Sequence, residues 1–178
     1  HHTNAFDSSK ITKYFKNQTP ETNLQGQFVD PFFPPNEASL LAKDQNGNWI
    51  GDDSSKDAID SKTVVWRSAS QIFDNIYNLF DGKIECDDIK QGSLGNCYFL
   101  SSLAALCEYP VQIYNIFRTK EKSAHGYYEI CLFIEGHWQI VIVDDYFPVL
   151  ASNEKSFKFS KPNGKELWSV LLEKAWAK

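Results

Sequence analysis

Methionine is absent from the 178 residues of this chain, and several features that define other classes of protein are absent as well. No hydrophobic run approaches the ~18 residues that span a bilayer, and no signal-peptide pattern opens the sequence. Lys and Arg form no cluster and the net charge is −5, which leaves no electrostatic footprint for nucleic acid. No two cysteines have the CxxC spacing of a zinc site. These absences argue against a membrane-spanning, nucleic-acid-binding or zinc-binding protein.

The ends of the sequence indicate a piece of a longer polypeptide, because it begins with His1-His2 in place of an initiator methionine. These histidines are compatible with the remnant of a tag, and the polar, weakly patterned residues 1–27 are interpreted as an N-terminal extension. A hydrophobic content of 42% and an aromatic content of 15% predict a folded, globular remainder.

Two local patterns predict the regular structure. Antiparallel strands are expected over Tyr127–Ile134 and His137–Val143, because both are rich in aromatic and β-branched residues and flank the two-residue turn Glu135-Gly136. Phe147-Pro148 is expected to begin a loop. Helices are expected from about Cys97 to the break at Glu108-Tyr109-Pro110, over Val111–Arg118, and over Glu166–Lys178. Helices followed by a local hairpin indicate an α+β architecture.

Aromatic residues and prolines alternate in Phe28–Pro35, which cannot form a regular helix. We expect this segment to be an extended arm that places aromatic rings on the core.

The stretch Gln91–Leu106 has the strongest chemical signal. Gly92, Ser93 and Gly95 predict a tight loop, and the apolar segment that follows predicts a buried helix with Cys97 in its first turn. The positive end of a helix dipole favours the thiolate, which is the nucleophilic form of cysteine. Gln91 carries an amide that could donate to a developing oxyanion. The pattern is typical of an acyl-transfer site.

A cysteine nucleophile also needs a base, which is usually an imidazole. His125 and His137 lie at expected turns and are interpreted as exposed turn residues, so that the sequence offers half of a site. Cys86, Cys107 and Cys131 are interpreted as small core residues with reduced thiols.

The stretch around Cys97 resembles the active-site signature of the calpain family of cysteine proteases, and further motifs of that family follow in register. Phe28–Leu40 resembles its arm and Val65-Trp66-Arg67 its Trp-basic element. Trp138–Asp145 resembles its hairpin with an acidic pair, and Leu167–Lys178 its closing helix. The resemblance covers residues 28–178.

The resemblance implies a papain-like cysteine proteinase fold split into two subdomains, of which this chain holds the first. That subdomain is expected to be mainly helical, with a central Cys-bearing helix and a small antiparallel hairpin. Cys97 is implied as the nucleophile, and Gln91 with the Cys97 backbone N–H as the oxyanion donors. The catalytic His and Asn are implied in a second subdomain beyond Lys178, so that the chain alone is expected to be inactive. A cytoplasmic endopeptidase that cleaves protein substrates is expected.

Calcium is the cofactor that the resemblance implies. Its ligands fall by motif on the carbonyls of Phe80 and Gly82 and on the carboxylates of Asp88 and Glu166, a set of oxygen donors that suits Ca²⁺. The interval between Gly82 and Asp88 is one residue longer than usual, so that Asp87 is an alternative to Asp88.

Two residues at the nucleophile depart from the family pattern, since Asn96 replaces an Asp and Tyr98 replaces a Trp. Neither change is expected to inactivate the site, because removal of a carboxylate does not oppose ionisation of a thiol. The rival interpretation is a non-catalytic calpain-like module that binds calcium or a protein partner. A Gly-His and an Asn-Pro-Trp downstream would favour the enzyme.

Overall fold

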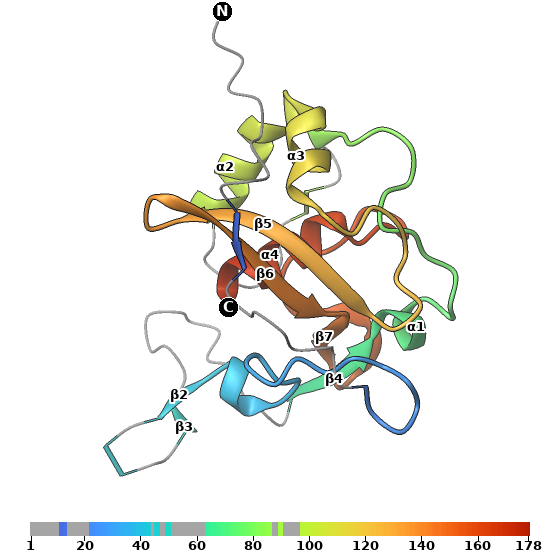
Figure 1. Cartoon of the computed structure of the whole chain (residues 1–178). Coiled ribbons are helices and arrows are strands. Elements are labelled where there is room, and N and C mark those ends of the chain that lie inside the picture. The colour runs from blue at the N-terminus through green and yellow to red at the C-terminus, as the bar shows by residue number, and fades with distance from the viewer. Residues whose placement is uncertain are drawn as a thin grey trace, which may run out of the picture.

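The computed structural model describes residues 11–13, 22–43, 45–46, 49–50, 63–86, 89–90 and 97–178, and it gives only the backbone of residues 11–13, 42–43, 49–50 and 97. These residues form an α+β structure (Figure 1), as the sequence predicts. The helices are η2 (Glu37–Ser39, a 3₁₀ turn), α1 (Ala69–Ile72), α2 (Cys97–Cys107), α3 (Pro110–Ile116) and α4 (Trp168–Ala177). The strands are β1 (Ile11–Lys13), β2 (Ala42–Lys43), β3 (Trp49–Ile50), β4 (Val64–Ser68), β5 (Tyr127–Ile134), β6 (His137–Asp144), β7 (Tyr146–Leu150) and β8 (Asn153–Phe157).

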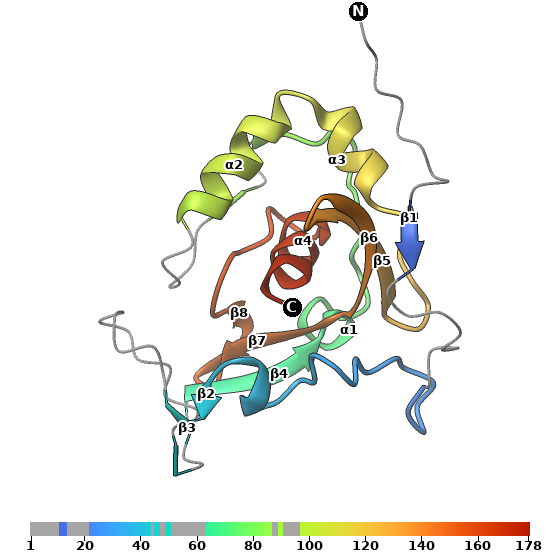
Figure 2. The ribbon, with the colours of Figure 1, turned by 60° about the vertical axis from the view of Figure 1, so that its left-hand side comes forward.

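Helix α4 lies at the centre of the molecule. Figure 2 shows it between the arch of α2 and α3 and the strands β4 and β7, with β5 and β6 beside it. Trp168 and Leu171 are fully buried, and Lys174 is the one charged residue of the helix to be buried with them. Because so much of its surface is apolar and enclosed, α4 connects the helical and strand layers through one core.

The hairpin of β5 and β6 is confirmed, with Ile134 paired to His137 across the turn. Glu135 and Gly136 have φ values of +51° and +84°, which is the conformation of a type I′ turn. This turn matches the right-handed twist of the strands, and Gly136 adopts it without strain. β1 adds a parallel strand beside β6.

A second sheet is antiparallel and has the strand order β4-β7-β8. Its strand β7 occupies the residues where a loop was expected. The prediction that Phe147-Pro148 begins a loop is wrong, because β7 continues through both residues. Pro148 lies opposite Trp66, and its carbonyl accepts a hydrogen bond of 3.0 Å from the Lys158 N–H. The registered pairs with β8 begin at Val149, one residue later, so that this ladder does not need the N–H that proline lacks.

Two other expectations need correction. The first subdomain was expected to be mainly helical, yet the described residues hold eight strands beside four α-helices, because the segment after Asp144 returns as β7 and β8. Cys86 was expected in the core, whereas its side chain is exposed at the surface of a loop. Cys107 and Cys131 are buried as predicted. In the described part of the chain no helix is both long and apolar enough to cross a membrane.

The aromatic arm lies on the core as predicted. Phe28 is buried, and its ring meets Tyr127 edge-on with 5.2 Å between the centroids. Its N–H donates to the His125 carbonyl at 2.7 Å. Phe32, further along the arm, is 56% exposed. The arm therefore fastens to β5 at its start and leaves one aromatic ring at the surface.

Candidate active site

Helix α2 begins at Cys97, so the backbone places this residue in the first turn, as the sequence predicts. Phe99, Leu100 and Leu103 are buried on one side of the helix, and the residues between them are exposed. The helix is therefore anchored along one side by apolar contacts. Gln91, the expected oxyanion donor, lies outside the described residues.

Trp176 of α4 contacts the first turn of α2 in two ways. Its ring stacks on Phe99 with 5.7 Å between centroids and an interplanar angle of 25°. Its indole Nε1–H donates to the Tyr98 hydroxyl at 3.3 Å. Both partners follow Cys97 directly, so α4 orients the turn that carries the candidate nucleophile. Nothing in the sequence pairs Trp176 with Tyr98, because the contact joins residues that are 78 positions apart.

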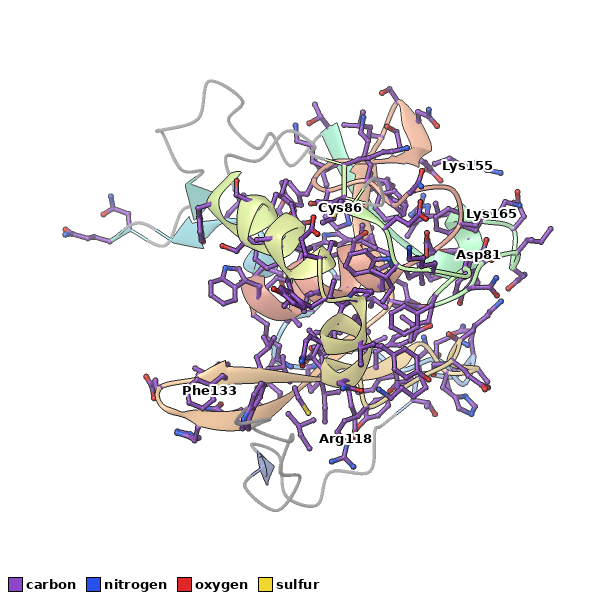
Figure 3. The ribbon with its side chains drawn as sticks, turned by 90° about the horizontal axis from the view of Figure 1, so that it is seen from above. Asp81, Cys86, Arg118, Phe133, Lys155 and Lys165 are labelled. Atoms are coloured by element: carbon purple, nitrogen blue, oxygen red, sulfur yellow. The ribbon has the colours of Figure 1, made fainter. Side chains whose placement is uncertain are left out.

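Three of the four expected calcium ligands fall on described residues, and the structure brings them together. The chain at Asn78 runs parallel to Glu166: the Asn78 N–H donates to the Lys165 carbonyl, and the Leu167 N–H donates to the Asn78 carbonyl. Next to this pairing, Oε2 of the Glu166 carboxylate accepts a hydrogen bond of 3.0 Å from the Asp81 N–H. Asp81 lies between Phe80 and Gly82, and Figure 3 labels it near Lys165.

The local conformation supports this cradle. The Phe80 ring packs against Tyr114 and Phe117, each at 5.3 Å between centroids, which anchors the segment to α3 and the residue after it. Gly82 has a φ of +85°, in the left-handed region that glycine adopts without strain. Glu166 is 6% exposed.

The fourth expected ligand is Asp88, or its alternative Asp87, and both are outside the described residues. Among the residues that the structure does describe, no three His, Cys, Asp or Glu side chains form a metal-binding group. The expected set has only two carboxylates, since its other ligands are backbone carbonyls. The oxygen donors at Phe80, Gly82 and Glu166 therefore fit a hard cation such as Ca²⁺ in chemical type.

Two buried ion pairs fasten α4 and the residue that follows it to the strand layer. Lys174 Nζ forms an ion pair with Asp144 Oδ1 and donates a hydrogen bond to the Tyr146 carbonyl at 2.6 Å. Lys178 Nζ donates to Asp30 Oδ2 at 2.7 Å and to the Ile142 carbonyl at 2.8 Å. Burial lowers the pKa of Lys174, and the charge of Asp144 opposes that change. The two pairs hold the arm, β6 and α4 in one arrangement.

Asp145 is the least satisfied acid of the described core. The Tyr77 hydroxyl donates to its Oδ2 at 3.3 Å, while no partner reaches its buried Oδ1 in the described structure. A Cβ at Gly126 would lie 2.6 Å from Oδ1, so that glycine is required at that position. Burial, together with the neighbouring charge of Asp144, raises the pKa of Asp145 to about 6.

Both histidines of the expected turns lie at the surface. His125 is exposed, with Nδ1 at 2.8 Å from the Gly26 carbonyl. His137 is exposed at the hairpin turn, where its ring nitrogens meet Glu135 O and Gln139 Nε2. Both are exposed as the sequence predicts, His125 in a turn and His137 directly after one.

The first turn of α2 at Cys97, the arm, and the acidic pair on its hairpin match one family of proteins. The pattern of the calpain family cysteine proteases covers residues 28–178, and the chain belongs to this family. It is similar to the calpain-type cysteine protease DEK1 of Arabidopsis thaliana, with 34% identity in an alignment of 160 residues that covers 85% of this chain and 7% of that protein.

Other relatives agree. The calpain-1 catalytic subunit of Homo sapiens is 32% identical over 154 residues, which cover 85% of this chain and 20% of that protein. Human calpain-12 is 33% identical over 159 residues with the same coverage. The chain thus spans a fifth or less of the length of these relatives. Family membership implies a papain-like fold.

Proposed function

We propose that this chain is the nucleophile-bearing subdomain of a calcium-dependent, calpain-type endopeptidase that makes limited cuts in intracellular proteins. Membership of the calpain family over residues 28–178 carries this proposal. The start of α2 at Cys97 supports it, because the position of the candidate nucleophile at a helix N-terminus is the one that thiolate chemistry favours.

The proposed reaction is an acyl transfer. The Cys97 thiolate attacks the carbonyl carbon of a peptide bond, and the negative charge that develops on oxygen is stabilised by the Gln91 amide and the Cys97 N–H. Collapse of this intermediate expels the amine and leaves a thioester, which water then hydrolyses. The His of a second subdomain of the same polypeptide serves as the base and then as the acid for these proton transfers, and the Asn of that subdomain orients its imidazole, so that this chain alone is inactive.

Calcium enters as a structural cofactor. We propose that the carbonyls of Phe80 and Gly82 and the carboxylates of Glu166 and Asp88, or Asp87, hold one Ca²⁺. The ion would supply a positive charge that draws these segments together. Glu166 immediately precedes Leu167 and α4, and Trp176 of α4 contacts the first turn of α2. Calcium binding at Glu166 would therefore be linked to the helix of Cys97 through α4 and Trp176.

Replacement of Cys97 tests the nucleophile. In the full-length protein that contains this chain, Cys97→Ala is expected to abolish Ca²⁺-stimulated cleavage of casein, and Cys131→Ser, which changes a buried thiol of β5, is the matched control. Activity in the Cys97→Ala protein equal to that of the wild type would remove Cys97 from the mechanism. Activity that persists without Ca²⁺ would contradict only the calcium dependence.

Calorimetric titration of this chain with Ca²⁺ tests the ligands. Glu166→Gln keeps the shape of the side chain and the hydrogen bond from the Asp81 N–H but removes a charge, and is expected to weaken binding at least tenfold, about 1.4 kcal/mol. Glu121→Gln, at an exposed position, is the control for the loss of one negative charge. Equal affinity of the Glu166→Gln chain and the wild type would exclude Glu166 as a ligand.

The location of the protein in the cytoplasm is part of the proposal, because a cysteine nucleophile works only while its thiol stays reduced.

A further inference from the structure

Two thiols outside the proposed mechanism lie across from one another. Cys86 is an exposed residue of the segment that precedes α2 in the sequence, and Cys107 is the buried last residue of α2. Figure 3 shows Cys86 beside the α2 ribbon. The loop and the end of the helix are therefore neighbours, each carrying a cysteine.

The contacts of the two sulfurs cross. Cys86 Sγ donates to the Ala104 carbonyl at 3.6 Å, and Cys107 Sγ donates to the Glu85 carbonyl at 4.0 Å. Ala104 precedes Cys107 by three residues, so that both lie on the same side of the helix. Its carbonyl points toward the following turn, where Cys107 lies. Glu85 is joined to Cys86 by one peptide bond.

Each sulfur thus contacts the backbone beside the other cysteine. A disulfide requires the two Cα atoms to approach within about 7 Å, with the Cβ atoms facing each other. The crossed contacts place each sulfur beside the backbone of the other segment, so that side-chain rotation and a small shift of the exposed loop would bring the two cysteines into this geometry.

We propose that Cys86 and Cys107 form a reversible disulfide when the protein meets a low-molecular-weight disulfide such as oxidised glutathione. Cys86 is the entry point because it is exposed, whereas Cys107 is buried behind it and acts as the resolving thiol. Formation of this bond requires neither the proposed calcium binding nor the Cys97 nucleophile, although Cys86 directly precedes Asp87 and Asp88 in the sequence.

The exchange proceeds in two balanced steps. The Cys86 thiolate attacks one sulfur of oxidised glutathione, which forms a mixed disulfide and releases one glutathione thiolate. The Cys107 thiolate then attacks Cys86 Sγ, which forms the protein disulfide and releases the second glutathione. The two protein thiols are oxidised, the glutathione disulfide is reduced, and the two thiol protons end on the released glutathiones.

The bond would close the chain from residue 86 to residue 107, the interval that contains Gln91 and Cys97. Closing a loop of this length restricts the unfolded chain, and the unfolding midpoint of the oxidised form is expected to rise by about 5 °C. Oxidation would thereby tie Cys86 to the last residue of α2, the helix that begins at Cys97.

Cys131 supplies the contrast. It is fully buried on β5, and burial raises the pKa of its thiol, so that it is a poor nucleophile for this exchange.

The experiment uses this chain with Cys97→Ala, which removes the other reactive thiol. The protein is incubated with oxidised glutathione, its remaining thiols are alkylated, and peptides are mapped by mass spectrometry without reduction. A peptide that links Cys86 to Cys107 is expected, and reduced glutathione should reverse the link. In the same background Cys107→Ser is expected to trap glutathione on Cys86, and Cys131→Ser is expected to leave the link unchanged.

Cys86→Ser changes an exposed position and tests the same bond without disturbing the core. It is expected to leave Cys107 reduced and to abolish the rise in the unfolding midpoint. A persistent glutathione adduct on Cys86 beside a reduced Cys107 would overturn the proposal. A link from Cys86 to Cys131, or two unreacted thiols, would overturn it as well. None of these outcomes depends on proteolytic activity.

Discussion

Replacement of Lys174 by methionine tests how the candidate site is held together. Lys174 is 5% exposed in its side chain and is bonded to Asp144, which is fully buried. Methionine retains most of the apolar stem but removes the charge and both hydrogen bonds. Asp144 would then be a buried carboxylate without its cation.

The size of the effect follows from what Asp144 keeps. Removal of one partner from a buried ion pair typically costs about 3–5 kcal/mol of unfolding free energy. Asp144 still accepts hydrogen bonds from the Asp30 N–H at 2.7 Å and the Tyr146 N–H at 2.9 Å, and these stabilise its charge. We therefore expect the lower end of the range, about 3 kcal/mol, and a fall of roughly 10 °C in the unfolding midpoint.

Urea unfolding followed by tryptophan fluorescence measures this loss. The matched control is Lys155→Met, because Lys155 also pairs with an aspartate, Asp74, but both side chains are more than half exposed. That change is expected to cost less than about 1 kcal/mol. If Lys174→Met cost no more than Lys155→Met, the buried pair would not hold α4 to β6.

Two further predictions concern α4 and its surroundings. The pKa of Asp145 is about 6 in the fold against about 3.9 unfolded, so the folded state binds more protons between these values, and stability falls as pH rises through them. Asp145→Asn should remove about 2 kcal/mol of this pH dependence between pH 4.5 and 7, as measured by urea unfolding at the two values; an unchanged slope would contradict the assignment. Trp176→Ala removes the stack on Phe99 and the bond to Tyr98, and is expected to speed amide exchange at Ser101 roughly fivefold, about 1 kcal/mol. Exchange at the wild-type rate would show that α4 does not order α2.

Local patterns in the sequence predicted the local structure well. The hairpin was found with its turn because alternation and turn residues act over two to eight positions, and Glu135-Gly136 adopts the required conformation. The helix at Cys97 was found for a similar reason, since a glycine-rich approach and an apolar run signal a helix start. His125 was also placed correctly in a turn, and His137 directly follows the hairpin turn as the first residue of β6.

Long-range contacts account for what the sequence missed. Pro148 argues for a loop locally, but pairing with Trp66 extends β7 through it. Cysteine is a residue type that is usually buried, but the loop that carries Cys86 leaves its side chain exposed. The contact of Trp176 with Tyr98 joins distant segments and leaves no periodic signal. Lysines four apart at 174 and 178 could have suggested two partners on one side, although not which aspartates they meet.

The position of α4 gives these separate contacts one physical consequence. The segment that leads into it carries Glu166 beside the Phe80–Gly82 loop, its middle is paired with β6 through Lys174, and its end touches the first turn of α2 through Trp176. A rigid helix transmits a displacement at one end to the other, because its backbone bonds resist bending. A displacement of Glu166 therefore need not be transmitted to Cys97 through residues 86–97. It can reach the first turn of α2 along α4, provided that the buried Lys174–Asp144 pair keeps that helix in place.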